Sequence, residues 1–167
     1  MKRFLSLLFL MILTLTGCSV KDVSERECVA DSLDFPALPA FYLTAALPAE
    51  AAQTASSEDG RFTVFSTADY EIFQEIFPAD SAEAGLSAVT GKAADRLSPI
   101  PISSFPHPEY RFAWTAAGEN GPLSCLGTLL YDGQYCYALT IRCPVAAEKK
   151  YRETFLEILS SVSLNEV

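Results

Sequence analysis

Residues 123–142 read LSCLGTLLYDGQYCYALTIR and place two strand-forming runs on either side of Asp132-Gly133. A two-residue hairpin turn of the primed type holds both of its residues at positive φ, which aspartate tolerates and glycine adopts freely. The pattern therefore predicts a β-hairpin in which Tyr131 faces Gln134. Its two strands are Leu123–Tyr131 and Gln134–Arg142.

The segments on both sides of this hairpin extend the sheet and cover it. Upstream, Tyr110-Arg111-Phe112-Ala113-Trp114 alternates, which predicts a strand with its aromatic rings on one face. Residues 118–121, Gly-Glu-Asn-Gly, then turn the chain. Downstream, Ala146–Val162 carries an apolar stripe at helical spacing, which predicts an amphipathic helix packed on the core. The stripe consists of Tyr151, Phe155, Ile158, Leu159 and Val162.

The first half of the chain carries shorter elements. The predicted strands are residues 41–47, 61–66 and 70–77. The spacing of the apolar residues in 70–77 also fits a helix, but the short run and Pro78 favour a strand that pairs with 61–66 across residues 67–69. Ser81 and Gly91 supply the caps of a helix over 81–90. The expected connections are a loop at 49–60 and an extended, proline-rich surface segment at 93–108.

This order of elements resembles the PsbP-like domains. The resemblance rests on the alternating strand, the glycine turn, the long Asp-Gly hairpin, the tyrosine-rich strand and a C-terminal helix ending in Leu159-Ser160-Ser161-Val162, over residues 109–164. It implies an α+β fold, in which an antiparallel sheet is sandwiched between helices as an α/β/α sandwich. It also implies a family frequent in bacterial lipoproteins, whose members act mostly as accessory or assembly factors, and no catalytic motif accompanies it.

The N-terminus predicts export and lipidation. Lys2 and Arg3 precede an apolar run, and Leu15-Thr16-Gly17-Cys18 then reads as a lipoprotein cleavage box. We expect cleavage between Gly17 and Cys18, with a lipid attached to the Cys18 thiol. The segments are a signal peptide at 1–17, a lipidated tether at 18–33 and a single α+β domain at 34–167. The alternatives are a non-lipidated secretory signal and a transmembrane anchor, although the uncharged run from Phe4 to Val20 is shorter than the ~20 residues a spanning helix needs.

Charge restricts the class of partner. The chain carries a formal net charge of −9, and cleavage removes the two cations Lys2 and Arg3, so the mature side chains carry −11. Nucleic acids and bare anionic lipid are disfavoured, because both bind basic patches and the mature chain has none. A partner should therefore present a neutral or basic surface, beside a membrane reached through the lipid anchor.

Four cysteines remain once Cys18 is acylated: Cys28, Cys125, Cys136 and Cys143. Because disulfides form in exported proteins, bonds between these four thiols have to be considered. The predicted register places Cys125 opposite Thr140 and Cys136 opposite Leu129. Cys125 and Cys136 are then four residue pairs, or roughly 13 Å, apart along the ladder, which is too far for a disulfide. Cys143 should point to the other face of the sheet from Cys136. A Cys28–Cys143 bridge remains open, and the same separations disfavour a zinc site.

Catalytic candidates are few. His107 is the only histidine and lies between two prolines, while Ser103, Ser104, Cys125 and Cys136 qualify as nucleophiles by residue type alone. Nucleophile-elbow, phosphate-loop, dinucleotide and calcium-loop motifs are all missing from the sequence. The carboxylate pairs Asp31/Asp34 and Glu71/Glu75 fit an acidic surface. We therefore expect no catalytic, cofactor or metal residues.

Two classes of function remain. The first is a non-enzymatic, protein-binding accessory lipoprotein of the bacterial cell membrane, facing the extracytoplasmic side; an exposed apolar patch would favour it. The alternative is a small-ligand-binding or hydrolytic envelope lipoprotein, which would show a deep pocket with convergent polar groups and His107 in its wall.

The lipidation site is directly testable. Cys18→Ala should abolish acylation and leave the precursor unprocessed in the native host, because the thiol that receives the lipid is gone. Mass spectrometry of the N-terminal peptide from membranes measures both effects. An unmodified Cys18 in wild-type membranes would contradict the assignment.

Overall fold

The computed structural model describes residues 38–103 and 106–167. The predicted signal peptide, the cleavage site at Gly17, the lipidation site Cys18 and the tether lie outside the described residues, as do Cys28 and Ser104. None of the helices in the described part of the chain has the length and apolar character needed to cross a membrane.

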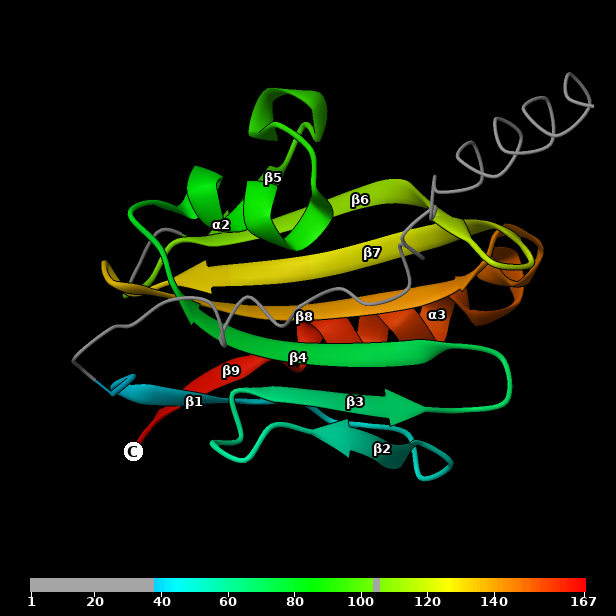
Figure 1. Ribbon diagram of the computed structural model, residues 1–167, viewed down its shortest axis with the longest axis horizontal. Helices are drawn as coiled ribbons and strands as arrows, with labels where there is room; N and C mark the ends of the chain where they lie inside the picture. The colour runs from blue at the N-terminus through cyan, green and yellow to red at the C-terminus, as the bar shows by residue number, and fades with distance from the viewer. Residues whose placement is uncertain (1–37, 104–105) are drawn as a thin grey trace, which may run out of the picture.

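The described residues form an α+β fold, as predicted, with a seven-stranded antiparallel sheet in the order β2-β3-β4-β8-β7-β6-β5 (Figure 1). A separate two-stranded ribbon pairs β1 with β9. The strands are β1 (Phe41–Thr44), β2 (Ala52–Ser56), β3 (Phe62–Ser66), β4 (Glu71–Pro78), β5 (Ile100–Ser103), β6 (Glu109–Gly118), β7 (Gly121–Tyr131), β8 (Tyr135–Pro144) and β9 (Ser163–Glu166). The helices are α2 (Ala82–Thr90), the 3₁₀ turn η2 (Ala94–Arg96) and α3 (Val145–Ser160).

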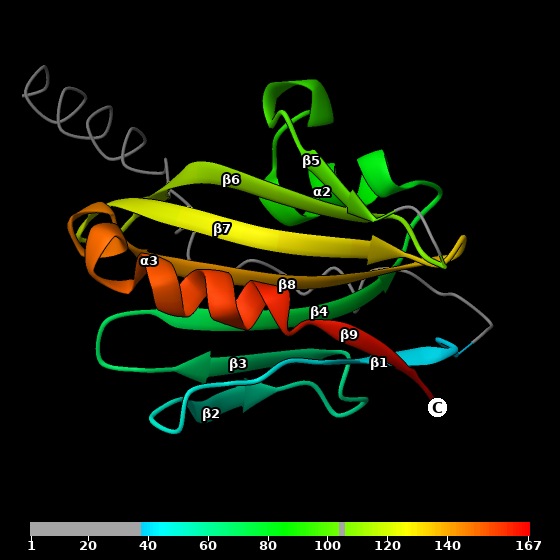
Figure 2. The ribbon, with the colours of Figure 1, turned by 180° about the vertical axis from the view of Figure 1, so that it is seen from behind.

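The central strand β8 alternates between two hydrophobic cores. Its odd-numbered residues from Tyr135 to Cys143 face α3, where Phe155, Ile158 and Leu159 are buried against them. Its residues Cys136 and Ala138 face α2 on the opposite side. Figures 1 and 2 show the sheet from these two sides, which we call the α2 face and the α3 face. The predicted apolar stripe of the C-terminal helix therefore packs in the core.

A helix lies on each face, and both make their main sheet contacts with β7 and β8. On the α2 face, strand β3 and the first half of β4 consequently lie outside the cover of α2 (Figure 1). The caps of α2 are as predicted: Ser81 Oγ accepts from the Ala84 N–H at 3.1 Å, and Gly91 ends the helix at φ +67°. Residues 71–78 form a strand that pairs with β3 in the expected hairpin.

Three segments differ from the sequence prediction. The expected loop at 49–60 contains β2, the proline-rich connection contains η2 and β5, and the C-terminal β9 was not predicted. Every side chain of β2 and β5 is exposed. These edge strands are held by backbone pairing with one neighbour, so they lack the hydrophobic alternation on which sequence prediction depends.

The register predicted for the β7–β8 hairpin is wrong by two residues. Tyr131 pairs with Cys136 rather than Gln134, so Cys125 faces Arg142 and Leu129 faces Ala138. The reason is Asp132, whose Oδ1 accepts from the N–H groups of Gln134 and Tyr135 at 2.8 and 2.6 Å. The turn is thus centred on Gly133 and Gln134. Of these two residues only Gly133 has a positive φ, at +102°. A shift of two residues leaves each side chain on its predicted face.

Gly85 sets how closely α2 approaches the sheet. A Cβ at this position would overlap Cys136 Sγ and lie 3.2 Å from Leu129 Cδ1. Because both side chains are fully buried, neither has free space into which it can move. The glycine therefore allows the helix backbone to rest on β7 and β8.

Gly85→Ala is expected to lower the free energy of unfolding by about 1 kcal/mol, because overpacking costs about 1–3 kcal/mol while alanine regains about 1 kcal/mol of helix propensity. Chemical denaturation measures the change. Adding Cys136→Ala should offset part of the loss, since the new methyl occupies space vacated by Sγ. A single variant more stable than wild type would show that α2 does not sit this close.

Candidate functional site

The histidine singled out by the sequence packs as a structural side chain. His107 lies before β6, with its ring edge against Phe41 at a centroid distance of 4.8 Å. It lines neither of the two cavities described below. Ser103 ends the exposed edge strand β5. The structure therefore does not place the predicted candidates around a common cavity.

The cysteines are poorly suited to nucleophilic chemistry. Cys125, Cys136 and Cys143 are all buried, and no disulfide joins any of them to another described residue. Cys136 and Cys143 lie in the cores on opposite faces, as predicted. Burial raises the pKa of the Cys136 thiol to about 12, and nearby Asp132 and Glu83 add to the effect. The reactive thiolate is thus strongly disfavoured at neutral pH.

Two adjoining cavities together form what we call the β3–β4–β8 groove. The larger lies on the α2 face, and the smaller lies at the end of the sheet, where Tyr70 and Cys143 of the α3-side core also line it. Their volumes are about 390 and 250 Å³, and both are lined by Glu71 and Arg142. The larger is also lined by Thr54, Ala55, Phe62, Val64, Phe73 and Glu75. The smaller is also lined by Ser66, Thr67, Ala68, Asp69, Tyr70, Leu123, Cys143 and Pro144.

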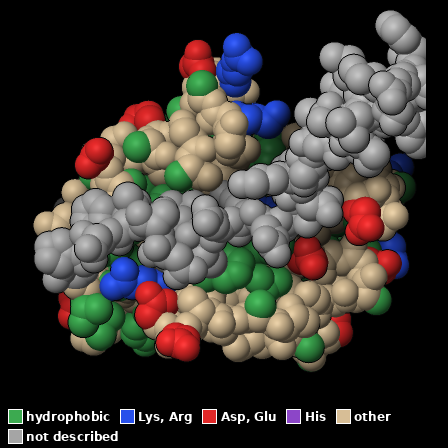
Figure 3. Space-filling model, in the orientation of Figure 1, with side chains coloured by type: hydrophobic (Ala, Val, Ile, Leu, Met, Phe, Trp, Pro, Cys, Tyr) green, Lys and Arg blue, Asp and Glu red, His purple; other side chains and the backbone are tan. Residues whose placement is uncertain are grey.

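The cross-strand register explains why these side chains share a face. Ser66, Glu71 and Arg142 form one row across β3, β4 and β8. A second row contains Val64 and Phe73, and a third contains Phe62 and Glu75. Residues directly opposite one another in a ladder point to the same side of a sheet. Figure 3 shows hydrophobic side chains gathered on this face over β3 and β4, with acidic side chains to either side.

Charges of opposite sign line the groove. The guanidinium carbon of Arg142 lies 4.1 Å from the ring centroid of Phe73, a cation–π contact. Phe73 itself lies between Glu71 and Glu75 on β4. Glu71 is exposed, whereas Glu75 is only 5% exposed although it lines the larger cavity. The groove thus contains one exposed carboxylate, at Glu71, one buried carboxylate, at Glu75, and the stacked pair of Arg142 and Phe73.

The smaller cavity ends at a polar contact between the β3–β4 turn and α3. Tyr151 donates its hydroxyl to Asp69, and Lys150 Nζ lies 3.2 Å from the same carboxylate oxygen. The Tyr151 hydrogen bond, followed by the hydrogen bond and charge of Lys150, lowers the pKa of Asp69. These groups are exposed to solvent, so their main effect is to position the turn at the end of the groove.

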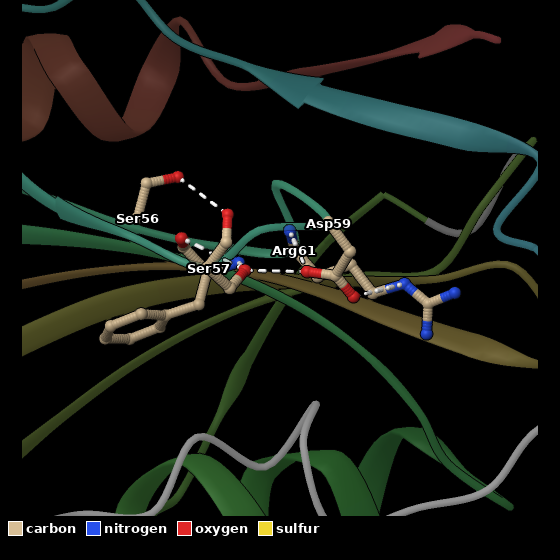
Figure 4. A network of polar contacts seen from close by, with 5 residues as sticks. Ser56, Ser57, Asp59 and Arg61 are labelled. Atoms are coloured by element: carbon tan, nitrogen blue, oxygen red, sulfur yellow. Dashed lines mark hydrogen bonds and ion pairs between the residues drawn. The ribbon is translucent and has the colours of Figure 1, made fainter.

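The opposite end is organised by the β2–β3 turn (Figure 4). Ser57 Oγ donates to Asp59 Oδ1 at 2.7 Å and accepts from the Phe62 N–H at 3.0 Å. Asp59 also accepts a hydrogen bond from the Arg61 backbone N–H at 3.0 Å. Its other carboxylate oxygen forms an ion pair with the guanidinium of Arg61 at 3.2 Å. This network holds the edge strand β2 against β3, so that Thr54 and Ala55 form a wall of the groove.

Sequence reasoning identified Glu71 and Glu75 as a carboxylate pair and assigned them to an acidic surface. The structure corrects this for Glu75, which is buried in the cavity wall. Arg142 was missed, although it is the first charged residue after the otherwise uncharged run Tyr135–Ile141. In the described residues, no three His, Cys, Asp or Glu side chains are grouped as metal ligands would be.

Comparison with known proteins establishes the fold. No protein-family model and no curated protein matches the sequence. The crystal structure of LpqN, involved in cell envelope biogenesis of Mycobacterium tuberculosis, matches with a TM-score of 0.52 and 8% identity, over 75% of this chain and 84% of that chain. The solution structure of cyanobacterial PsbP (CyanoP) from Synechocystis sp. PCC 6803 matches with a TM-score of 0.53 and 8% identity, over 80% and 98% of the two chains. The domain therefore has a PsbP-like fold.

The raised pKa of Cys136 is testable by alkylation. In the native protein at a pH of about 8.5, where an ordinary thiol is half ionised, Cys136 should resist iodoacetamide because burial disfavours its thiolate. After denaturation it should react at the rate of a free thiol. Peptide mapping by mass spectrometry measures both states. Rapid native alkylation of Cys136 would contradict the described packing.

Proposed function

We propose that this chain is an exported, lipid-anchored protein of the bacterial cell envelope that acts by binding another envelope protein, without catalysis. The observation that carries the proposal is the β3–β4–β8 groove, which is open to solvent and lined by apolar and charged side chains. The only histidine packs elsewhere, against Phe41. An open groove with this lining suits recognition of a polypeptide surface better than enclosure of a reacting molecule.

The location is inferred from the N-terminus and supported by the fold. Leu15-Thr16-Gly17-Cys18 provides the cleavage and lipidation signal. LpqN, which shares the fold, is involved in cell envelope biogenesis. We extend that location, and the complete α/β/α sandwich of PsbP-like domains, to this chain as part of the proposal. Two or three acyl chains on Cys18 would hold the domain stably at the membrane, facing the extracytoplasmic side.

The alternative is a small-ligand-binding or hydrolytic domain. The volume of the larger cavity, about 390 Å³, favours this alternative because it lies within the usual range for ligand pockets. Hydrolysis by paired carboxylates is disfavoured, because Phe73 with Arg142 over its ring lies between Glu71 and Glu75. Binding of a small molecule without chemistry is therefore the stronger form of the alternative.

Crosslinking on intact cells tests the proposal. Wild-type protein should capture a reproducible envelope protein, and Cys18→Ala should reduce that capture because the unprocessed precursor lacks the lipid that places the mature domain beside its partner. Added salt should also weaken the association, since the mature side chains, which carry −11 once Lys2 and Arg3 are removed, favour a basic partner surface.

The same crosslinking experiment distinguishes protein binding from the alternative of small-ligand binding. If no protein is captured reproducibly while a metabolite co-purifies with the protein, the accessory role is wrong and small-ligand binding takes its place. Capture that is equal for wild type and Cys18→Ala would show that binding does not depend on the anchor.

A further inference from the structure

We propose that the segment from the end of α2 through β5 contacts the lipid bilayer to which the chain is anchored, by placing Ile100 and Ile102 among the headgroups and the upper acyl chains. We call this segment, residues 91–103, the η2–β5 protrusion. In Figures 1 and 2 it stands out beyond the β5 edge of the sheet, at the opposite end of the strand order from β2. The inference rests on the proposed function, because it requires the anchor, and it specifies the surface that meets the membrane.

The protrusion is fixed to the domain at one point and exposes its largest apolar side chains. Leu97 is buried in the core beneath α2, and Ala94 packs against the same core. Except for Ala94, Leu97 and Pro99, every residue from 91 to 103 is exposed. Ile100 is 62% exposed and Ile102 is 47% exposed. An isoleucine gains free energy when it leaves water, so this edge of the sheet favours contact with an apolar phase.

The backbone of the protrusion is strained between its buried and exposed parts. Among the described residues, Ser98 is the only one other than glycine with a positive φ, at +46°. It also precedes Pro99, and a residue before proline prefers an extended backbone. Strain of this kind persists only where the surrounding structure holds it, and it is common at functional sites. Here it separates the buried Leu97 from the exposed strand that carries Ile100.

The prolines of the protrusion disfavour an added β-strand as the occupant of this edge. An added strand binds through the backbone N–H and C=O groups of the edge, and neither Pro99 nor Pro101 has an N–H. The pairing of β5 with β6 also shifts between Pro101 and Ser103. Prolines and bulges make an edge strand a poor template for pairing. Insertion of side chains into the headgroup region makes no such demand, because water there still hydrogen-bonds the backbone.

Charge favours the approach of this part of the molecule to a membrane. The protrusion has two cations, Lys92 and Arg96, and one carboxylate, Asp95, all of them exposed, whereas the whole chain carries −9. Asp95 is the only carboxylate between Glu83 and Glu109. Figure 3 shows basic side chains at the top of the view, where the segment protrudes. Because the net charge of the chain opposes anionic lipid, burial of apolar side chains should drive the contact.

The distance between the anchor and the domain allows this orientation. Residues 19–37 separate Cys18 from Leu38. A segment of 19 residues spans at most about 65 Å when fully extended. The anchor therefore does not prevent the β5 edge from meeting the bilayer.

The test measures bilayer contact by fluorescence quenching. The lipidated protein is reconstituted into phosphatidylcholine vesicles with and without brominated acyl chains. Ile100→Trp places a reporter on the protrusion, and wild type, whose only tryptophan is Trp114, gives the background. Leu156→Trp is the matched control, because Leu156 is 45% exposed on α3. Brominated lipid should quench the Ile100→Trp emission about twofold or more, because an interfacial side chain lies roughly 5–10 Å deep, and should leave Leu156→Trp nearly unchanged.

A second pair of variants tests whether the apolar side chains cause the contact. Ile102→Ser, added to Ile100→Trp, should reduce the quenching about twofold, because one inserted side chain is lost. Val145→Ser, added to Ile100→Trp, removes an exposed apolar side chain from α3 and should not change the quenching. Added salt should have little effect, since burial of apolar groups is not screened by ions.

Equal quenching of Ile100→Trp and Leu156→Trp, or none in either, would overturn the inference. Lipidation of Cys18, measured by mass spectrometry on the same protein, would still stand in that case. An unlipidated Cys18 would contradict the anchor and the inference with it. Absence of quenching together with loss of a crosslinked partner from Ile100→Ser/Ile102→Ser cells would show that the protrusion binds a protein instead of the bilayer.

Discussion

The two-sided burial of β8 is the constraint on which the rest of the structure depends. From Tyr135 to Ile141 every residue of the strand is buried, so its odd residues require a partner layer on one face and its even residues on the other. Helix α3 and the β1–β9 ribbon meet the first requirement, and α2 meets the second. Cys136 lies at the tightest point, beneath Gly85, where only a glycine lets the helix backbone approach.

The groove arises where this two-sided cover stops. Arg142 follows the buried run of β8 and is only half-buried, and its guanidinium rests on Phe73 at a place that α2 does not reach. The charged residue thus lies at the boundary between the core beneath α2 and the open part of the same face. The β2–β3 turn network and the Asp69 contacts with α3 hold the two ends of the groove, so its shape depends on elements far apart in the sequence.

The hairpin shows how one side chain changes a local rule. The Asp-Gly dipeptide correctly marks the reversal between β7 and β8, but Asp132 uses its carboxylate to cap the turn and receives the Tyr137 hydroxyl at 2.6 Å. Those hydrogen bonds favour aspartate at the first position of the turn rather than at its centre, so the pairing shifts by two residues. Tyr137 lies on β8, five residues after Asp132. The sequence alone does not reveal that its hydroxyl reaches the Asp132 carboxylate.

The sequence by itself determined the α+β class, the strands from β6 to β8, the hairpin of β3 and β4, the caps of α2 and the buried stripe of α3, because each depends on local periodicity or turn chemistry. It also placed Cys136 and Cys143 on opposite faces, since alternation survives a register shift of two. Only the tertiary structure decided the edge strands β2 and β5, whose side chains are all exposed, and the four-residue strand β9, which pairs with β1 and packs Leu164 on the core. It alone brought Glu71, Glu75 and Arg142 into one groove, because antiparallel pairing of β4 with β8 joins residues about 70 positions apart in the chain, a separation that no local pattern encodes.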